Sequence, residues 1–454
     1  MIINNIINKN EYTKNFSRFN YKEKSLIFYP KNLNEIKKII TYSKFKKKKI
    51  LCIGSSLSWY DTITNKNNYL ISLKKYEKKI IVNKKFKYIY LSSNITMKEA
   101  IKIANDYNYS IASIPGNLDV TIGGCISNDV HGKDSFKNGN FSENVIELSI
   151  LLPNKKIIKC SKNKNRNLFR SIAGGLGMIG IILHAKIRLI PMHKYYLTET
   201  YKCFNYKELI DTLYKDRNYY DFIYGWIDTY GVNNQIGRGI VFKSRKNYSN
   251  IINQKKIFFI INFNFIKEMI LRIFMLKKKM KILNSIFFRF HKKLDTKYET
   301  QIQIIDTLSS KNIFLPKLIM PNSFVEIQII IPINKKIILK KFLELCQKLK
   351  IDGLIVGVKM HKKNNCFLSF CDEGFSVGIN SICNQNETKE IKKYLFLYKF
   401  IKKNKCKIYL CKDFFLNHDH FLQIYPKFNE FKKIRDKYDP KKLLNSDFFS
   451  RLFH

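Results

Sequence analysis

Hydrophobic and polar residues alternate along the first part of the chain in an order typical of short strands and helices. Leu33 to Tyr42 carries apolar residues at spacings of three and four, which predicts a helix, and the apolar run Lys49 to Ile53 predicts a strand after it. Met97 to Tyr107 again has helical spacing. Asn144 to Leu152 predicts a strand, and the Pro-Asn-Lys that follows it is typical of a hairpin turn.

From residue 193 to residue 400, strands and helices continue to alternate, without the glycine-rich loops found earlier in the chain. Phe324 to Pro332 has the composition of a buried strand, interrupted by Glu326 and Gln328. Buried polar side chains need partners, and a ligand could supply them. The alternative is an edge strand that turns these two side chains to water.

One stretch, Pro115 to Lys133, gathers glycines, short polar side chains and a histidine. Its glycines can take positive φ and bring backbone close to a ligand, and consecutive free N–H groups form concave anion sites. The histidine titrates near neutral pH. A plain glycine-rich loop between two strands is the alternative interpretation. The residues of interest are Gly116, Thr121, Gly123, Gly124, Ser127, Asn128, His131 and Gly132.

Composition is that of a folded globular protein and leaves the meaning of the charge open. The 454 residues are 45% hydrophobic and 14% aromatic, enough for two or three domains. With 83 Lys and Arg against 35 Asp and Glu, the net charge is +48. Nucleic acid, an anionic membrane, an anionic ligand or compositional drift would each account for it. No nucleic-acid-binding motif supports the first, so we expect no nucleic-acid partner.

Cysteine and histidine usage argues against metal or disulfide chemistry. The ten cysteines form no CxxC pair, and no histidine cluster has metal-ligand spacing, so we expect no metal. Several cysteines lie in apolar runs and are interpreted as buried thiols in a reducing compartment. The N-terminus lacks a signal-peptide pattern, and no window is long and apolar enough to span a membrane. We therefore expect a cytoplasmic protein.

Three glycine-containing segments together resemble those of the flavoproteins of the vanillyl-alcohol oxidase and p-cresol methylhydroxylase superfamily. The first, Gly54 to Asp61, is similar to the family turn G-x-G-x-S-x-x-D, with Ser56 in place of the second glycine. The second is PG-x-x-x-x-T-x-GG from Pro115, followed by N-D-V-H-G-K, and the third runs from Ala173 to Ile182. Within the superfamily, D-V-H-G-K most resembles the flavoprotein subunit of the decaprenylphosphoryl-ribose 2'-epimerases.

The resemblance implies an α+β protein with bound FAD. A two-subdomain FAD-binding domain of the p-cresol methylhydroxylase type would span residues 1–192, divided at about 1–92 and 93–192. An α+β cap with an antiparallel sheet would span 193–405, and 406–454 would return to the flavin. Leu57 stands where some relatives carry a histidine bonded to the flavin, so the FAD is expected to be non-covalent. The implied cofactor-binding residues are Gly54, Ser55, Ser56, Leu57, Ser58, Trp59, Pro115, Gly116, Asn117, Thr121, Gly123, Gly124, Ser127, Asn128, His131, Gly132, Ile182, Tyr409 and Lys412.

The resemblance also suggests the reacting groups. Hydride transfer to the flavin leaves negative charge that a cation stabilises, and Lys412 would be that cation. Removal of the hydroxyl proton needs a base, and Lys412, Lys359 and His131 stay open as candidates. The asparagine and cysteine of the epimerases are missing at Ser376 and Gly378. Gln328 completes the catalytic set, and the expected substrate contacts are Lys133, Glu326, Gln328, Lys359 and Ser376.

The leading functional prediction is an FAD-dependent oxidoreductase that oxidises a polyprenylphosphoryl pentose, the 2'-OH to a 2'-keto group, by hydride transfer to flavin N5. A short-chain NAD(P)-dependent reductase would complete this epimerisation, in cell-envelope polysaccharide synthesis. The alternative enzyme is an aldonolactone oxidase of the D-arabinono-1,4-lactone or L-gulonolactone type. Many of these carry a C-terminal H-W-G-K motif, whereas Asn417 to His420 reads N-H-D-H here. A basic nucleic-acid-binding protein is the alternative that is not an enzyme.

The segment with the least resemblance suggests a membrane surface. Seven apolar residues from Phe265 to Phe287 recur at spacings of three and four and share one helical face. Nine Lys and Arg and one acid lie between Phe265 and Lys293. This profile is typical of a helix on anionic lipid, which a lipid-linked substrate would require. The enzyme is therefore expected to be peripheral on the cytoplasmic membrane; a helix that covers the cap domain is the alternative.

Overall fold

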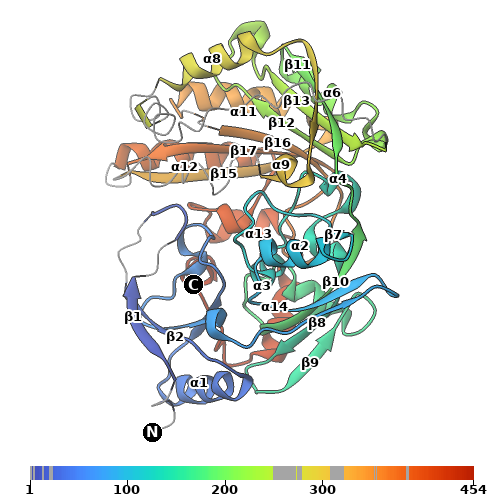
Figure 1. Cartoon of the computed structure of the whole chain (residues 1–454). Helices are drawn as coiled ribbons and strands as arrows, with labels where there is room; N and C mark the ends of the chain where they lie inside the picture. The colour runs from blue at the N-terminus through green and yellow to red at the C-terminus, as the bar shows by residue number, and fades with distance from the viewer. Residues whose placement is uncertain are drawn as a thin grey trace.

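The computed structural model describes residues 3, 6–12, 15–19, 24–248, 272–273, 279–306, 322–351, 353, 355–384 and 388–453, and its strands form three sheets (Figure 1). The first contains β1 (Asn8–Tyr12), β2 (Lys24–Phe28), β3 (Ile50–Ile53) and β4 (Tyr69–Ser72). Its order is β1-β2-β4-β3, with β1 antiparallel to β2 and the other pairs parallel. The predicted helix is confirmed as α1 (Leu33–Phe45), which buries its apolar stripe of Ile36, Ile39 and Ile40.

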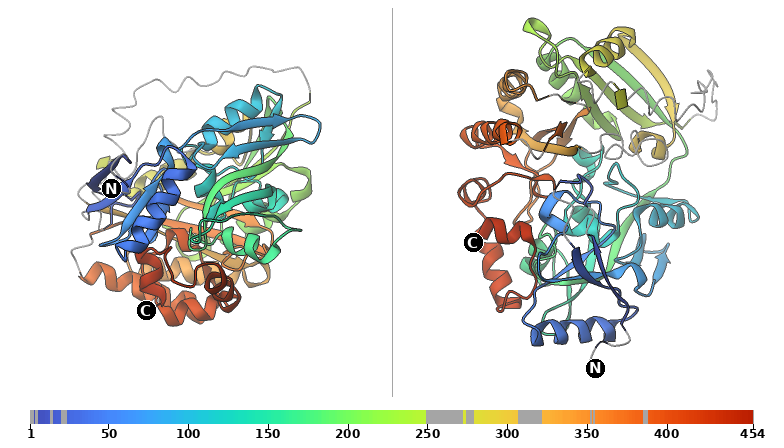
Figure 2. Two further views of the ribbon diagram at one scale, coloured as in Figure 1. Left: turned by 90° about the horizontal axis from the view of Figure 1, so that it is seen from below. Right: turned by 90° about the vertical axis from the view of Figure 1, so that its left-hand side faces the viewer.

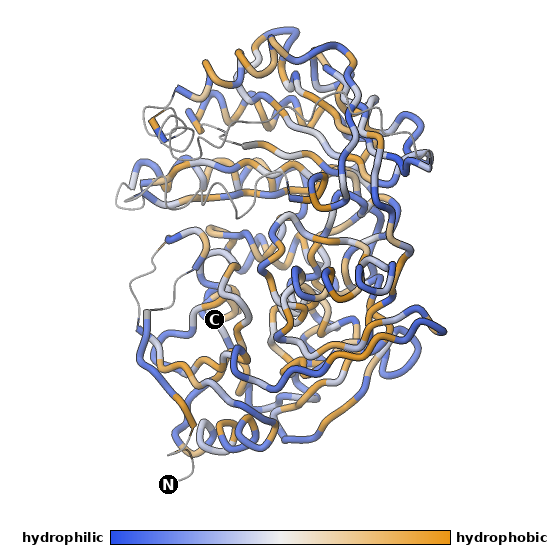
Figure 3. The backbone as a smooth tube through the Cα atoms, viewed as in Figure 1, coloured by the Kyte–Doolittle hydropathy of each residue, from blue (hydrophilic) through white to orange (hydrophobic). Residues whose placement is uncertain are grey.

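The second sheet is antiparallel and is built around its longest strand. Its strands are β5 (Ile80–Asn83), β6 (Tyr88–Ser92), β7 (Tyr109–Ile111), β8 (Val145–Leu151), β9 (Ile157–Cys160) and β10 (Ile181–Pro191). β10 pairs with β6, β7 and β8, and the predicted hairpin is confirmed as β8 paired with β9. Hydrophobic residues follow the strands in Figure 3, because alternate side chains such as Leu148 and Ile150 fill the core.

Short helices and turns connect these two sheets and carry the predicted glycine-rich segments. The α-helices are α2 (Met97–Asn105), α3 (Ile122–Ser127), α4 (Ser135–Asn138) and α5 (Arg166–Ile172). The 3-10 turns are η1 (Tyr60–Ile63), η2 (Leu73–Lys75) and η3 (Phe141–Asn144). The predicted helix at 97–107 is thus confirmed as α2, which begins with a capping box formed by Thr96 and Glu99.

The third sheet has eight antiparallel strands and lies in the upper half of Figure 1. Its order is β14-β11-β13-β12-β16-β17-β15-β18, so β15 is an interior strand and the edge-strand alternative for residues 324–332 is wrong. The strands are β11 (Tyr196–Cys203), β12 (Phe222–Ile227), β13 (Gly239–Lys246), β14 (Leu294–Glu299), β15 (Ser323–Pro332), β16 (Ile355–His361), β17 (Gly374–Cys383) and β18 (Lys407–Ile408).

Several helices are connected to this sheet. One face of the sheet is packed in an apolar core, and the other is turned to the first half of the chain. The helices are α6 (Tyr206–Tyr214), α8 (Met280–Phe290), α9 (Gln301–Ile305), α11 (Ile337–Lys348) and α12 (Thr388–Lys403), with 3-10 turns η4 (Arg217–Tyr219), η5 (Asn233–Gln235) and η6 (Ile333–Lys335). Val356, Val358 and Met360 of β16 are buried in the apolar core. His361, on the other face of β16, has its ring 4.8 Å from that of His131, so this face is turned to the first half of the chain.

The end of the chain packs back onto the first sheet. After β18 it forms η7 (Leu410–Lys412), α13 (His418–Ile424), α14 (Phe428–Tyr438) and α15 (Asp447–Phe453), seen along one side of the lower half in Figure 2. The Ile50 N–H donates to the Leu443 carbonyl at 2.9 Å, and Arg451 binds both Asp61 and Asp413. The fold is therefore α+β, and we retain 1–192, 193–405 and 406–454 as our proposed division of the chain.

The predicted apolar face of residues 265–287 lies mostly outside the described residues. Within α8, the buried residues are Met280, Asn284 and Phe288, whereas Phe287 is 46% exposed. Met280 and Phe287 of the predicted stripe thus differ in burial, and the prediction that this face lies on a membrane stays a prediction. Over the described part of the chain, no helix combines the length and apolarity needed to cross a membrane.

Candidate functional site

Two loops of the first half offer backbone N–H groups to a ligand. Among the described residues, no atom accepts from the N–H groups of residues 55–58 after β3 or of residues 116–117 after β7. The Ser55 hydroxyl donates to the Asp119 carbonyl at 2.6 Å and ties the two loops together. Consecutive unpaired amides of this kind form a concave donor surface for an anion such as a pyrophosphate. On this observation the residues present fit the predicted FAD.

Backbone conformation in these loops differs from the expectation for glycine. We expected positive φ at Gly116, Gly123 and Gly124, but none of them takes it. Gly123 and Gly124 lie in α3, where the backbone is helical. The residue that does take positive φ is Ser56, at 57°, in the place of the missing second glycine. The turn is thus kept although a side chain makes this conformation less favourable.

Close packing is the reason for glycine at two of these positions. A Cβ on Gly54 would lie 2.3 Å from Thr121 Oγ1, and a Cβ on Gly123 would lie 3.0 Å from Ser93 Cβ. Thr121 is itself fixed, because its hydroxyl accepts from the Gly124 N–H at 3.2 Å. The loop after β3 and the start of α3 are therefore pressed against each other, with no room for a side chain between them.

Side chains beside the loops connect them to the C-terminal segment. The Asn128 amide donates to Ser58 Oγ at 3.3 Å, and the Tyr409 hydroxyl donates to the Asn128 carbonyl at 2.8 Å. Trp59 is buried and stacks on Phe324 of β15 at 5.6 Å. The other predicted cofactor residues fall on these loops or on buried elements next to them: Leu57, Pro115, Asn117, Ser127, Gly132 and, on β10, Ile182.

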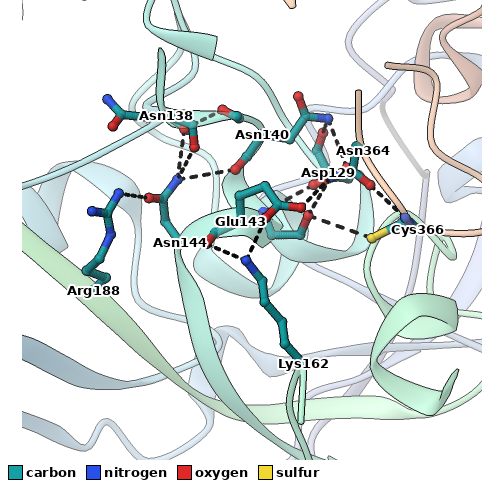
Figure 4. Close-up of polar contacts among 12 residues, drawn as sticks. Asp129, Asn138, Asn140, Glu143, Asn144, Lys162, Arg188, Asn364 and Cys366 are labelled. Carbon is teal, nitrogen blue, oxygen red and sulfur yellow. Dashed lines mark hydrogen bonds and ion pairs between the residues drawn. The ribbon is translucent and has the colours of Figure 1, made fainter. Parts of the chain in front are cut away.

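A buried polar network holds the segment that carries His131 (Figure 4). The Asp129 carboxylate accepts from the Asn140 amide at 2.9 Å and from the Ser142 N–H at 3.1 Å. Burial raises the pKa of Asp129 to about 6. Asn364, between β16 and β17, donates to Ser142 Oγ at 3.1 Å. The network therefore joins the loop after α3 to the third sheet.

A chain of side chains runs from His131 across the third sheet. The Gln328 amide donates to His131 Nε2 at 3.1 Å and to Ser376 Oγ at 3.2 Å. Ser376 Oγ lies 2.8 Å from His361 Nε2, and His361 Nδ1 lies 3.2 Å from the Cys371 sulfur. In this arrangement the amide fixes the His131 proton on Nδ1, because Nε2 accepts.

Within this row of bonded side chains, His131 Nδ1 and Gln328 Oε1 are buried and have no partner among the described residues. Both residues are buried, with 6% and 4% of their surface exposed. Buried polar atoms are paired in most proteins, so a donor and an acceptor left over on two side chains that are bonded to each other make this a candidate site for a ligand. Burial, and then the positive charge of Lys359, holds the pKa of His131 well below its ordinary value, so the ring is neutral.

Lys412 and Glu326 form an ion pair where the C-terminal segment meets β15. Their Nζ and Oε1 atoms are 2.5 Å apart. Gly378 on the neighbouring strand allows this, since a Cβ there would lie 2.7 Å from Glu326 Oε1. The departure from the epimerase pattern at Gly378 thus makes room for the carboxylate that holds Lys412.

The two remaining lysines of the predicted site differ in their surroundings. Lys133 donates to the Ile304 carbonyl at 2.5 Å and lies 3.7 Å from the centre of the Tyr224 ring, so its ammonium is used within the protein. Lys359 lies opposite both Tyr224 and Ser376 in the register of β12, β16 and β17. Burial, and then the charge of Lys412, lowers the pKa of Lys359 to about 8.

Sequence analysis missed three members of this site. His361 and Cys371 extend the chain from Ser376, and Tyr224 holds Lys133. His361 could have been found, because it stands two residues after Lys359 and alternate residues of a strand share a face. Tyr224 lies in the segment Tyr224 to Asp228, which resembles part of the epimerase cap, but nothing in the sequence pointed to its contact with Lys133. Cys371 gave no local signal, since only the folded sheet brings it here. No three His, Cys, Asp or Glu side chains of the described residues are placed to hold a metal ion.

Comparison with known families gives two matches that together cover most of the chain. Residues 25–161 match the FAD binding domain, and residues 185–452 match the D-arabinono-1,4-lactone oxidase family. The first match contains the loops at residues 54–58 and 115–133. The second contains the third sheet, Gln328, Lys359 and Lys412. The matches thus identify an FAD-binding domain, followed by a region of the D-arabinono-1,4-lactone oxidase family.

Similar curated proteins agree with these matches. The chain is 25% identical to the D-arabinono-1,4-lactone oxidase of Yarrowia lipolytica over 38% of this chain and 34% of that protein. It is 22% identical to the mouse L-gulonolactone oxidase over 44% of this chain and 45% of that protein. A third relative, cytokinin dehydrogenase 2 of Arabidopsis thaliana, is 33% identical over 24% of this chain and 22% of its own.

These relatives correct the more specific part of the resemblance. Membership of the FAD oxidase superfamily is confirmed, but the matches support the aldonolactone oxidase alternative better than the decaprenylphosphoryl-ribose epimerase interpretation. The matched region spans less than half the length of the lactone oxidases named above. The D-V-H-G-K motif lies in the first half of the chain, whereas Glu326, Gln328, Lys359 and Ser376, four of the five expected substrate contacts, lie on the third sheet.

Proposed function

The chain belongs to the D-arabinono-1,4-lactone oxidase family, and on that premise we propose that it oxidises a secondary hydroxyl of a small aldonolactone. The observation that carries the proposal is the pair of buried atoms without partners, His131 Nδ1 and Gln328 Oε1. The first can donate to a substrate oxygen and the second can accept from a substrate hydroxyl. A polyhydroxylated ring offers both groups, whereas an apolar ligand would leave these two atoms unpaired.

FAD, when bound, accepts the hydride from the substrate carbon and so supplies the redox chemistry. Lys412 is the cation placed to stabilise negative charge as it develops in the site. Glu326 holds the Lys412 ammonium at 2.5 Å and limits the directions in which it can point. A preorganised donor of this kind needs no rearrangement during the reaction.

Lys359 is our candidate for the group that takes the hydroxyl proton. Of the three bases left open by the sequence, Lys412 is paired with Glu326 and His131 uses its Nε2 lone pair to accept from Gln328. Lys359 has a pKa lowered to about 8, so a useful fraction of it is neutral at neutral to mildly alkaline pH. The O–H bond of the substrate would break as its proton passes to Lys359 Nζ.

The polyprenylphosphoryl pentose of our first interpretation becomes the second candidate substrate. The family match weighs against it, and so does Lys133, which we expected to contact the substrate but which binds Ile304 and Tyr224 instead. A reductase partner and a role in envelope synthesis belong to that interpretation alone. Under the aldonolactone proposal the electrons pass to oxygen or to another acceptor, and no second enzyme is needed.

The test is the visible spectrum of the purified protein followed by anaerobic reduction. We expect a flavin spectrum and, because Leu57 replaces the tethering histidine, release of all the colour on acid precipitation. D-Arabinono-1,4-lactone or L-gulono-1,4-lactone should bleach the flavin within seconds, whereas a soluble prenylphosphoryl pentose should not. Bleaching by the prenylphosphoryl pentose alone would contradict the lactone proposal, and colour that stays with the pellet would contradict non-covalent binding.

A further inference from the structure

Gly357 is an exposed glycine in an interior strand of the third sheet. Within the described part of the protein, no atom lies within 4 Å of the position of a Cβ at Gly357. Other glycines of the same sheet are crowded: a Cβ would lie 2.1 Å from the Trp226 carbonyl oxygen at Gly239 and 2.2 Å from the Ile331 carbonyl oxygen at Gly374. Crowding therefore explains the glycines at 239 and 374, but it does not explain Gly357.

The register of the sheet places this open position next to the reaction site. Gly357 stands opposite Trp226 of β12 on one side and Gly378 of β17 on the other, and Gly378 stands opposite Gln328 of β15. Directly opposed residues of antiparallel strands point to the same face. Since Gln328 binds His131 on this face, the row continues from the unpaired Gln328 Oε1 across two glycines to Trp226.

Gly378 and Gly357, the two glycines of this row, have different surroundings. A Cβ on Gly378 would lie 2.7 Å from Glu326 Oε1, so this glycine makes room for the carboxylate that holds Lys412. A Cβ on Gly357 would meet no atom of the described residues within 4 Å. A glycine inside a strand is less favourable than other residues unless backbone or ligand must approach closely. Since no backbone of the described residues comes close to Gly357, we interpret it as a place where a ligand approaches.

Trp226 forms the far end of the row. Its ring is half-buried and meets the Phe287 ring of α8 edge to face, with centroids 4.9 Å apart and an angle of 85°. This contact limits the rotation of the indole and leaves it beside the open floor at Gly357. A large, rigid aromatic surface next to bare backbone suits the C–H face of a sugar or lactone ring.

We propose that the space over Gly357, with Trp226 as its wall, is the subsite for the part of the substrate beyond the carbon that is oxidised, and that glycine at 357 sets the size of sugar accepted. The inference rests on the proposed function, because it places the reacting hydroxyl at His131 and Gln328. It adds a residue that determines specificity but takes no part in the chemistry.

The test is a graded series at this position. Gly357→Ala and Gly357→Val add one and three carbons to the floor, and both suit a strand better than glycine, so neither should lower the melting temperature. For Gly357→Val we expect the dissociation constant of six-carbon L-gulono-1,4-lactone to rise about tenfold or more, with a smaller rise for five-carbon D-arabinono-1,4-lactone. A four-carbon lactone should bind as it does to the wild type, and Gly357→Ala should fall in between.

Binding is measured by anaerobic isothermal titration calorimetry, which needs no tryptophan and so serves every variant, and flavin bleaching is recorded in parallel. The variant Gly357→Val/Trp226→Ala should regain part of the lost affinity for the larger lactone, because it removes the wall. Equal loss for all three lactones, or none, would overturn the subsite. If the wild type binds lactones without bleaching, the proposed reaction fails while the size series still decides the subsite. If the wild type binds none of them, both proposals are wrong.

Discussion

The loops at residues 55–58 and 116–117, which we call the flavin loops, and the third sheet present different groups to the ligands that we propose for them. The loops at residues 55–58 and 116–117 present backbone N–H groups, and glycine is needed at Gly54 because nothing larger fits. The third sheet presents side chains instead, with Glu326 and Gln328 on β15 and Lys359 on β16, the two strands that flank β17. Recognition by backbone N–H groups needs a few residues of fixed type at fixed spacing. Recognition by side chains can change through substitutions on one strand at a time.

This difference explains why the sequence identified the cofactor more reliably than the substrate. The glycine spacing of the loops is shared across the superfamily, so it points to FAD and nothing narrower. The residues that we propose as substrate contacts lie on β15, β16 and β17, where Ser376 and Gly378 already depart from the epimerase pattern. If the comparison holds, single truncations on the sheet should stop the chemistry, while changes in the loops should act on cofactor binding.

The largest effect is expected at Lys412. Lys412→Ala should slow flavin reduction between about a hundredfold and a thousandfold, because it removes the cation to which we assign the developing negative charge. Stopped-flow single-turnover reduction measures this directly. Lys412→Arg should recover only part of the rate, because the guanidinium has a different shape from the ammonium paired with Glu326.

A matched control is available five residues earlier. Lys407 also pairs with a carboxylate, Asp372, but at 3.3 Å and on the rim of the sheet. Lys407→Ala should leave the reduction rate within about twofold of the wild type, since exposed ion pairs contribute little. Equal rates in the Lys412→Ala variant and the wild type would show that Lys412 has another role.

The second effect is the pH dependence that Lys359 should impose. Its pKa is lowered to about 8, so the neutral form that can accept a proton accumulates as pH rises through that value. The rate constant of flavin reduction should therefore rise with pH through about 8 and level off above it. Lys359→Met should lower the plateau about a hundredfold and remove the rise. A rise near pH 8 that persists in this variant would assign the base elsewhere.

The third effect is expected at the flavin loops, on the affinity for FAD. Gly54→Ala places a methyl group 2.3 Å from Thr121 Oγ1, so one loop must shift, at a cost of about 1–3 kcal/mol. FAD affinity should fall about tenfold to a hundredfold, with an unchanged reduction rate in the molecules that stay loaded. An FAD affinity of Gly54→Ala equal to that of the wild type would contradict the crowding argument.

The local pattern of apolar and polar residues predicted individual helices and strands, but it could not predict which side chains would contact each other in the folded protein. The helices at 33–45 and 97–105 and the strand at 323–332 followed from periodicity and burial. Glu326 and Gln328 were recognised as polar residues in an apolar strand. Their partners, Lys412 and His131, lie 86 and 197 residues away, and only the packing of the third sheet on the first half brings them within reach. Non-local contacts of this kind leave no trace in composition or spacing.

The smallest effect is expected on the outer surface of α8. Ile282, Ile286 and Phe290 are exposed there, and Lys281 and Arg289 are exposed on the same helix. An exposed apolar row flanked by basic residues suits an anionic lipid surface, where each basic residue contributes about 1 kcal/mol. We therefore expect weak co-sedimentation with anionic liposomes at low salt, and none with neutral liposomes.

The net charge of +48 could bind any anionic surface, so the experiment needs a variant of equal charge. Lys281→Gln/Arg289→Gln removes two charges from α8, and Lys98→Gln/Lys102→Gln removes two exposed charges from α2 in the other half of the molecule. If α8 is the contact, the first pair should reduce the bound fraction several-fold and the second should barely change it. Equal losses would mean that the whole surface binds lipid by charge alone. The exposed apolar residues of α8 would then need a role other than lipid binding, such as packing within the cap domain.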